Sequence, residues 1–471
     1  MSKRSRSDRI SQATAKKAKQ EESKITYEAS WREVGPPGSK GLKPLIVLDG
    51  PGLPGRSQVV GFDMDSTIIT TKSGRTFPTG PSDWKFLYNQ ESTLTCRNVP
   101  DRLRELHKAG SKVVIFTNQG GIEKGKQDVK GLLQKIEDII CALCIPVQVF
   151  ISTGESEYRK PSTGMWDYME REANQGVVVD RNSCTYVGDA AGRAKDWAPG
   201  KPKDFNCSDR KFAANLGVKF FTPEEFFLGE APAPFEWRTF DPKHFLSNHP
   251  AGKGTTEYHS KEMVVMVALP AGGKSTFCKC HLVAHGYTAI NRDTLKTQAK
   301  CQQVSKDALK SGKSVVIDNT NSSKAARAEY ITIAKKAGTV CLACWDVTNR
   351  RLHMIRRLKR FGVSVPDLKS GNVGATCKSV ITLTHVSLTP AGVPVRCFHL
   401  VTPFDLAHHL NYFRQTQTKG TVRRIPDVAY NVFKKNFEEP TTAEGFTEVK
   451  TIEFQAHFDR KADEDLFKCW T

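Results

Sequence analysis

GFDMDSTI, residues 61–68, continues the apolar run QVV and ends it with two carboxylates, Asp63 and Asp65. On an extended chain, successive side chains point to opposite sides, so both carboxylates share one side and Met64 takes the other. Carboxylates that converge at a strand end repel each other unless a cation or a shared proton relieves them. Mg2+ suits such a pair because it takes oxygen ligands. The stretch therefore predicts a strand leading into a magnesium-dependent site, with a buried acid pair of no function as the alternative.

Short apolar runs alternate with helical stretches from about residue 42 to 228, and a second series of this kind begins near residue 263. Such alternation predicts an α/β fold with two parallel-sheet domains whose functional residues lie at the strand ends. The polar residues that follow the runs of the first series are Thr117, Asn118, Lys160 and Asp189. Their presence argues against an acid pair of no function.

The second series opens with VALPAGGKST, residues 267–276, which matches the phosphate-loop spacing G-x-x-x-x-G-K-[ST] except for Ala268 at the first glycine. Backbone N–H groups at the following helix N-terminus are expected to hold ATP phosphates. Lys274 is expected to reach the β- and γ-phosphates, and Ser275 to bind Mg2+. Ala268 would cost roughly 1 kcal/mol only if its backbone needs positive φ. The predicted ATP-binding residues here are Ala271, Gly272, Gly273, Lys274, Ser275 and Thr276.

Downstream residues favour a kinase that phosphorylates a hydroxyl group. Asp293 in NRDTL follows the next short strand, where it can take the proton of an attacking hydroxyl. SVVIDNTN ends another strand with Asp318 and Asn319. An arginine that covers the donor phosphates is also expected, and Arg414 in HLNYFRQT is the candidate. A structural strand-to-helix turn is the alternative.

The order Asp-x-Asp, Thr, Lys, Asp resembles the haloacid dehalogenase-type phosphatases. The resemblance implies that Asp63 is the nucleophile and that Asp65 is the general acid and base. It also implies that Thr117 and Lys160 hold the phosphoryl oxygens and that Asp189 completes the Mg2+ site. The family often has glycine where Ser66 stands. The gaps between these motifs are too short for a closed lid, so an open site for a phosphate at the end of a polymer is expected.

A longer resemblance covers about residues 25 to 458 apart from one segment. Its motifs are GFDMDSTIITTKSGRTFPTGPSDW, YRKPSTGMWDY, VGDAAGR, NRDTL, VVIDNTN and EEPTTAEGF, and together they look like the polynucleotide kinase 3'-phosphatase family. The resemblance implies removal of 3'-phosphates and ATP-dependent phosphorylation of 5'-hydroxyls at DNA ends (nicks, gaps and double-strand breaks). One alternative keeps the phosphatase and makes the kinase half a nucleic-acid-binding module. Another is a basic scaffold with two vestigial domains.

The charge of the chain favours a polyanionic partner. A formal net charge of +20 and a pI of about 9.4 are typical of proteins that bind nucleic acid. No run is apolar enough for a membrane span. The clusters Lys3-Arg4 and Lys16-Lys17-Lys19 resemble a two-part nuclear localisation signal, so a nuclear protein is expected; a solvated tail is the alternative. The pairs Cys141/Cys144 and Cys341/Cys344 are expected to be buried free cysteines and not zinc ligands.

The predicted domain order is a disordered basic tail (1–25), the phosphatase (26–228), a linker and docking segment (229–262) and the kinase (263–471). The stretch before the phosphatase is too short for the forkhead-associated domain of vertebrate relatives, so recruitment through that domain is not expected. Other strand-break repair proteins are candidate partners, and a monomer is expected. Residues 339–391 carry eight Lys or Arg against two acids and interrupt the family pattern. A translated retained intron is the preferred hypothesis for this segment, and an ordered insertion is the alternative.

Overall fold

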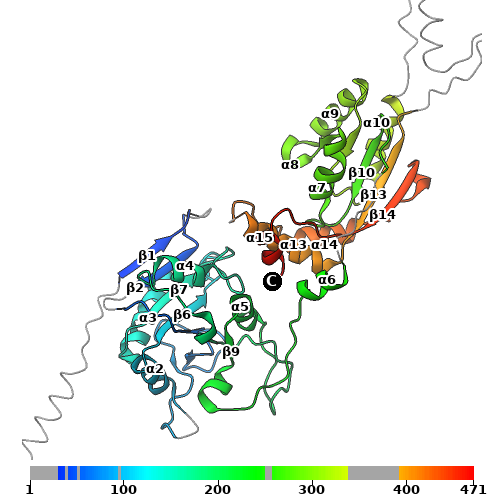
Figure 1. The fold of residues 1–471 in the computed structure, drawn as a ribbon. Helices are drawn as coiled ribbons and strands as arrows, with labels where there is room; N and C mark the ends of the chain where they lie inside the picture. The colour runs from blue at the N-terminus through cyan, green and yellow to red at the C-terminus, as the bar shows by residue number, and fades with distance from the viewer. Residues whose placement is uncertain are drawn as a thin grey trace, which may run out of the picture. The chain divides into compact units, whose positions relative to one another are not determined.

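The computed structural model describes residues 30–37, 41–49, 53–93, 97–249, 257–337, 392–418 and 420–471. They form two compact units (Figure 1). The first unit takes its residues from Met1–Ala251, His408–Arg424 and Ala456–Thr471, and the second from Gly252–Ala407 and Ile425–Gln455. The predicted basic tail and the 339–391 segment lie outside the described residues. The predicted domain boundaries remain predictions.

The first unit contains a seven-stranded sheet in the order β1-β2-β7-β6-β3-β8-β9. Its strands are β1 (Ser30–Val34), β2 (Leu45–Asp49), β3 (Val59–Phe62), β6 (Lys112–Asn118), β7 (Gln148–Ser152), β8 (Thr185–Val187) and β9 (Lys219–Phe221). The five strands from β7 to β9 are parallel, as predicted, whereas β1 and β2 pair antiparallel at one edge. A small hairpin of β4 (Ile69–Thr70) and β5 (Lys85–Phe86) follows β3.

Helices cover both faces of this sheet, which is why its central strands are continuous apolar runs. Along β6, Val113 and Ile115 enter one core, while Val114 and Phe116 enter the other. The helices are α2 (Val99–Lys108), α3 (Val129–Leu143), α4 (Gly164–Glu172), α5 (Ser208–Leu216), α6 (Pro242–Asn248) and α15 (Lys461–Phe467), with short turns at Arg181–Ser183 and Glu224–Leu228. The α2 and α3 side chains pack on the first core, and the α4 and α5 side chains on the second.

The second unit contains a five-stranded parallel sheet in the order β11-β12-β10-β13-β14. Its strands are β10 (Met263–Val267), β11 (Thr288–Ile290), β12 (Val315–Ile317), β13 (Val395–Val401) and β14 (Glu448–Glu453). Its helical segments are α7 (Lys274–Phe277), Cys278–Leu282, Val283–His285, α8 (Arg292–Leu295), α9 (Gln298–Lys310), α10 (Lys324–Ala337), α14 (Asp427–Asn436) and Thr442–Glu444. Helix α13 (Phe404–Gln417) begins in this unit and continues into the first.

The later stretches of the first unit, His408–Arg424 and Ala456–Thr471, pack closely against its earlier residues. Trp470 stacks on Trp237 with ring centroids 4.2 Å apart, and its backbone N–H donates to Asn215 Oδ1 at 2.7 Å. His409 on α13 is buried and lies against the ring of Phe240. The first unit therefore depends on residues that follow the second unit in sequence.

The structure bears on two further expectations, the absence of a membrane span and the state of the cysteine pairs. No helix in the described part of the chain is both long and apolar enough to cross a membrane. Cys141 and Cys144 are free, as predicted, but both are exposed, so the prediction that they are buried was wrong. They lie at the C-terminal end of α3, where Ile140 and Leu143 occupy the buried face instead. Cys341 and Cys344 lie outside the described residues.

Candidate active sites

The first candidate site lies at the carboxyl ends of β3, β6, β7 and β8, four adjacent parallel strands of the first unit. Asp63 directly follows β3, and its backbone N–H donates to Val187 O at the end of β8. Thr117 and Asn118 end β6. Because parallel strands bring their carboxyl ends to one sheet edge, residues far apart in sequence converge there.

Lys160 is the centre of this site. Its ammonium lies 2.6 Å from Asp63 Oδ1 and 2.8 Å from Asp209 Oδ1, and it donates to the Tyr186 hydroxyl at 2.9 Å. Asp209 at the start of α5 was not among the predicted site residues. Gly188 makes room for it, because an added Cβ there would lie 2.5 Å from the Asp209 carboxyl group.

Three carboxylates, those of Asp63, Asp189 and Asp209, gather within 4.8 Å of one another. Burial raises the pKa of Asp63 to about 7, while Lys160 opposes the rise and Asp209 adds to it. Burial, with the charges of Asp63 and Asp209, also raises the pKa of Asp189 well above its usual range. One lysine does not balance three clustered carboxylates, and oxygen donors are the ligands that Mg2+ prefers, so these residues fit that ion.

The Asp65 carboxylate lies outside this three-carboxylate group. It accepts hydrogen bonds from Gln119 Nε2 at 2.9 Å and Lys135 Nζ at 3.1 Å, and its side chain is half exposed. Gln119 also donates to Thr117 Oγ1 at 2.8 Å, which links Asp65 to a predicted phosphate ligand. Lys135 had a sequence signal: it interrupts the buried apolar face of α3. The predicted role of Asp65 as a metal ligand stays a prediction.

Asn118 positions the lysine loop by two reciprocal hydrogen bonds. Its side chain donates to the Lys160 carbonyl at 3.1 Å and accepts from the Lys160 backbone N–H at 3.0 Å. The same loop carries Ser162, whose hydroxyl bonds to that of Tyr412 on α13. The Lys160 loop is thus held from both β6 and α13.

Ser66, at the position where related phosphatases often have glycine, adopts a left-handed backbone with φ of 60°. Its N–H donates to Ile69 O at 2.7 Å, which closes the turn that presents Asp65. The turn therefore contains a serine in a conformation that usually favours glycine.

The second candidate site is the loop between β10 and α7 in the second unit. The left-handed residues of this loop are Ala271, with φ of 55°, and Gly273, with φ of 87°; Ala268 is not one of them. Ala268 is buried in the core beneath the sheet, where a small side chain is sufficient. The backbone strain expected from a missing glycine therefore falls on Ala271 and not on Ala268.

Lys274 folds back over this loop. Its ammonium donates to Leu269 O at 3.0 Å, and Thr402 Oγ1 donates to Gly272 O at 3.0 Å. Ser275 and Thr276 are exposed. Asp318 after β12 is buried, and its Oδ1 has no hydrogen-bond partner among the described residues. A nearly buried carboxylate oxygen without a partner fits a magnesium-bound nucleotide, so the donor set is compatible with MgATP.

Asp293 is exposed on α8, and its backbone N–H donates to Asn291 Oδ1 at 2.8 Å. Asn291 also donates to Asp318 Oδ2 at 3.0 Å and so joins the ends of β11 and β12. Arg414 belongs to the part of α13 that lies in the first unit, where it donates to Asn411 Oδ1 at 3.2 Å. Its predicted contact with ATP stays a prediction.

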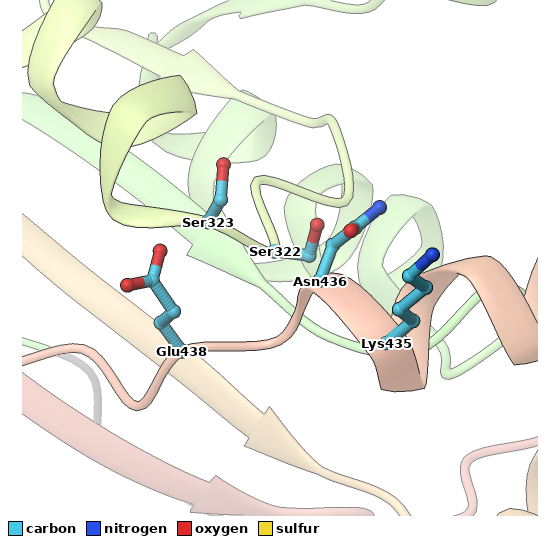
Figure 2. Close-up of a pocket in the computed structure, with 5 residues that line it drawn as sticks. All are labelled: Ser322, Ser323, Lys435, Asn436 and Glu438. Carbon is cyan, nitrogen blue, oxygen red and sulfur yellow. The ribbon is translucent and has the colours of Figure 1, made fainter.

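Figure 2 shows a further pocket of about 380 Å3 in the second unit, lined by Ser322, Ser323, Lys435, Asn436 and Glu438. Glu438 accepts the backbone N–H of Lys324 at 2.8 Å, at the start of α10. Because a carboxylate already occupies this helix terminus, the pocket does not suit a phosphate group.

Both halves of the chain match known protein families. Residues 58–227 match a family model described as polynucleotide kinase 3 phosphatase, and residues 263–361 match one described as an AAA domain. A bifunctional polynucleotide phosphatase/kinase of Schizosaccharomyces pombe is 33% identical over 415 residues, which cover 87% of this chain and 82% of the relative. A putative one of Acanthamoeba polyphaga mimivirus is 30% identical, with 89% and 90% covered. A polynucleotide 3'-phosphatase of Saccharomyces cerevisiae is 31% identical and matches 36% of this chain and 87% of its own length.

The fold and the two sites therefore define a haloacid dehalogenase-like phosphatase joined to a P-loop kinase. More particularly, the chain belongs to the bifunctional polynucleotide phosphatase/kinase family, because its similarity to the fission yeast protein extends through both halves. The predicted family and fold class are confirmed.

Proposed function

We propose that this protein removes phosphate from the 3' ends of polynucleotides and phosphorylates their 5'-hydroxyls with ATP. The observation that carries the proposal is that one chain presents both a buried Asp63–Lys160–Asp209 cluster and a phosphate loop with Lys274. Neither site alone requires the other, but removal of a 3'-phosphate and addition of a 5'-phosphate together make broken ends ligatable.

In the phosphatase reaction, an Asp63 oxygen attacks the phosphorus, and the bond from phosphorus to the 3'-oxygen breaks as Asp65 donates a proton to that oxygen. Water then attacks the aspartyl-phosphate, Asp65 takes its proton, and inorganic phosphate leaves. Lys160 and Thr117 hold the phosphoryl oxygens, and Gln119 and Lys135 orient the Asp65 carboxylate. Bound Mg2+, held by Asp63, Asp189 and Asp209, would neutralise the carboxylates and stabilise charge on the phosphoryl group.

In the kinase reaction, the substrate 5'-oxygen attacks the γ-phosphorus of ATP while Asp293 takes the hydroxyl proton, and ADP leaves. The backbone N–H groups of Ala271, Gly273 and Lys274 are the candidate donors to the phosphates, because that of Gly272 donates to Leu269 O at 3.0 Å. Ser275 and Asp318 are the candidate oxygen ligands for Mg2+. An exposed Asp293 suits a large substrate that approaches from solvent.

DNA ends are the substrate that we favour, in the nucleus, for repair of strand breaks. The net charge of +20 and the basic clusters near residues 3 and 16 support this part of the proposal. The substrate preference is tested by competition between DNA and RNA ends in one reaction. The nuclear location is tested by the cellular distribution of a variant with Lys16, Lys17 and Lys19 changed to Ala.

The decisive assay uses a nicked DNA duplex with a 3'-phosphate and a 5'-hydroxyl. Asp63→Ala should abolish phosphate release and retain transfer of label from ATP, whereas Lys274→Ala should do the reverse. Each variant is the other's folding control, because each retains one activity. If the unmodified protein never labels a 5'-hydroxyl, the kinase half of the proposal fails and the alternative of a binding module is favoured.

A further inference from the structure

The loop of residues 193–206 begins and ends beside the phosphatase carboxylates. Asp189 precedes it and Asp209 follows it, and both belong to the three-carboxylate cluster. At its base, Ala190 N–H donates to Asp209 Oδ2 at 3.1 Å, and Asp209 N–H donates to Ala190 O at 3.1 Å. The 193–206 loop therefore borders the site at which a 3'-phosphate would react.

Buried contacts hold this loop in one shape. The Arg193 guanidinium is buried and forms ion pairs with Asp204 and Glu224, both at 2.9 Å. Arg238 donates to the backbone carbonyls of Arg193 and Asp204. Trp197 lies over Arg193, with the guanidinium carbon 3.8 Å from the ring centroid. The loop is thus a fixed platform and not a loose connection.

The platform displays an aromatic ring and positive charges to solvent. Phe205 is 93% exposed, the most exposed of the large apolar side chains in the described part of the chain. Lys195, Lys201 and Lys203 are exposed, and none of them forms an ion pair with a described residue. A rigid loop that leaves a phenylalanine in water forgoes the burial that most such side chains obtain.

We propose that the 193–206 loop binds the polynucleotide strand upstream of the reacting 3'-phosphate. Phe205 stacks on an unpaired base, and Lys201 and Lys203 contact backbone phosphates. The proposal rests on the proposed phosphatase function. Aromatic rings stack on any base, and lysines track the backbone, so such a surface holds single strands without sequence preference. The net charge of +20 favours this partner over a second protein.

The test compares two substrates of the full-length protein: a single-stranded oligonucleotide with a 3'-phosphate, and a nucleoside 3'-monophosphate, which has no upstream strand for the loop to bind. Phe205→Ala should raise KM for the oligonucleotide roughly five- to a hundredfold and leave kcat unchanged. The mononucleotide kinetics should not change. Lys201→Glu with Lys203→Glu should also raise the oligonucleotide KM and flatten its dependence on salt.

Two variants serve as controls. Val178→Ala removes another highly exposed apolar side chain of the same unit and should change neither substrate's kinetics. Phe205→Trp keeps a stacking ring and should retain the low KM. Equal oligonucleotide kinetics for Phe205→Ala and the unmodified protein would overturn the loop proposal and leave the proposed function standing. No phosphate release from any polynucleotide by the unmodified protein would overturn both.

Discussion

Ser66 and Ala271 both hold left-handed backbone conformations that most sequences give to glycine. Ser66 lies in the turn after Asp63, and Ala271 lies in the loop before Lys274. A non-glycine residue in this region costs about 1–2 kcal/mol of conformational energy. Glycine would avoid that cost but would lose more conformational freedom on folding, so the net gain from a glycine is smaller. Both predicted active sites thus contain one tolerated, strained residue.

Ala271→Gly should therefore raise the free energy of unfolding of the second unit by up to about 1 kcal/mol. Ala268→Gly is the matched control: Ala268 is buried and has no positive φ, so this change should destabilise the unit by about 1 kcal/mol. Urea unfolding of both variants measures whether the free energy of unfolding rises or falls. A loss of stability in both variants would contradict the assignment of strain to Ala271.

Asp209→Asn should lower phosphatase kcat/KM about 10- to 100-fold and raise the Mg2+ concentration needed for half-maximal rate, because one of three clustered carboxylates is lost. The kinase rate should not change. Asp196→Asn removes an exposed carboxylate from the loop between Asp189 and Asp209 and should leave the Mg2+ dependence unaltered. A magnesium titration of phosphate release measures the effect; an unchanged titration for Asp209→Asn would exclude Asp209 from the metal site.

Most residues of this site that follow strands were predicted from the sequence, whereas Gln119 after β6 and the residues carried by helices were overlooked. Asp63, Thr117 and Asp189 lie at or directly after strand ends, where motif spacing is informative. Asp209 begins a helix twenty positions after Asp189, and its place beside Lys160 depends on how the intervening loop folds back. Lys135 could have been found, because a buried lysine on an apolar helix face needs an acidic partner.

At the scale of elements, the central strands and the edge strand β11 were predictable from the sequence, whereas the edge strands β1, β9 and β14 were not. Strands such as β3, β6 and β10 are unbroken apolar runs because helices cover both sheet faces. In contrast, β1 (SWREV) and β14 (EVKTIE) contain charged residues and have no fully buried position, so their sequences resemble loops. Edge strands need fewer apolar residues because only part of their surface is buried.

Helix α13 makes the first unit sensitive to acid through His409. Burial lowers the pKa of His409 to about 4, and its Nε2 donates to Phe467 O at 2.8 Å. An unfolded histidine titrates near 6.5, so between about pH 6.5 and 4 only the unfolded chain gains the proton. Stability should therefore fall as pH drops through this window, by as much as about 3 kcal/mol.

His409→Gln should flatten this pH dependence, because the amide can still donate to Phe467 O but does not titrate. Unfolding free energies at pH 7.5 and pH 5 measure the difference. His244→Gln, at an exposed position on α6, is the control and should preserve the wild-type dependence. An equally steep loss of stability in His409→Gln would assign the acid sensitivity to other groups.

At the scale of the whole chain, the flanks of the 339–391 segment lie next to each other. Val393 N–H donates to Ala334 O at 3.1 Å, and an added Cβ at Gly392 would lie 2.8 Å from Lys335 Cα. Helix α10 before the segment and strand β13 after it contribute side chains to the same hydrophobic core. The described residues on either side of the segment are therefore already packed against each other.

Deletion of residues 339–391 should yield a protein that folds and phosphorylates 5'-hydroxyls at least as fast as the full chain. The phosphatase rate is the internal control and should not change. End-labelling from ATP on the nicked duplex measures the outcome, and loss of labelling would favour an ordered, functional insertion. Sequencing transcripts across both junctions tests the origin of the segment, because its presence in every mature transcript would oppose a retained intron.

The first unit is assembled from stretches that the ribosome makes at different times. Its sheet is complete in the nascent chain by residue 251, but its helical partner begins only at residue 408. At common elongation rates the delay is roughly ten to thirty seconds. During that interval the surfaces that receive Tyr412 and Trp470 are uncovered. A stop codon in the kinase half would therefore release a phosphatase unit that lacks some or all of these late contacts. The surface left exposed is one that cellular quality control can recognise.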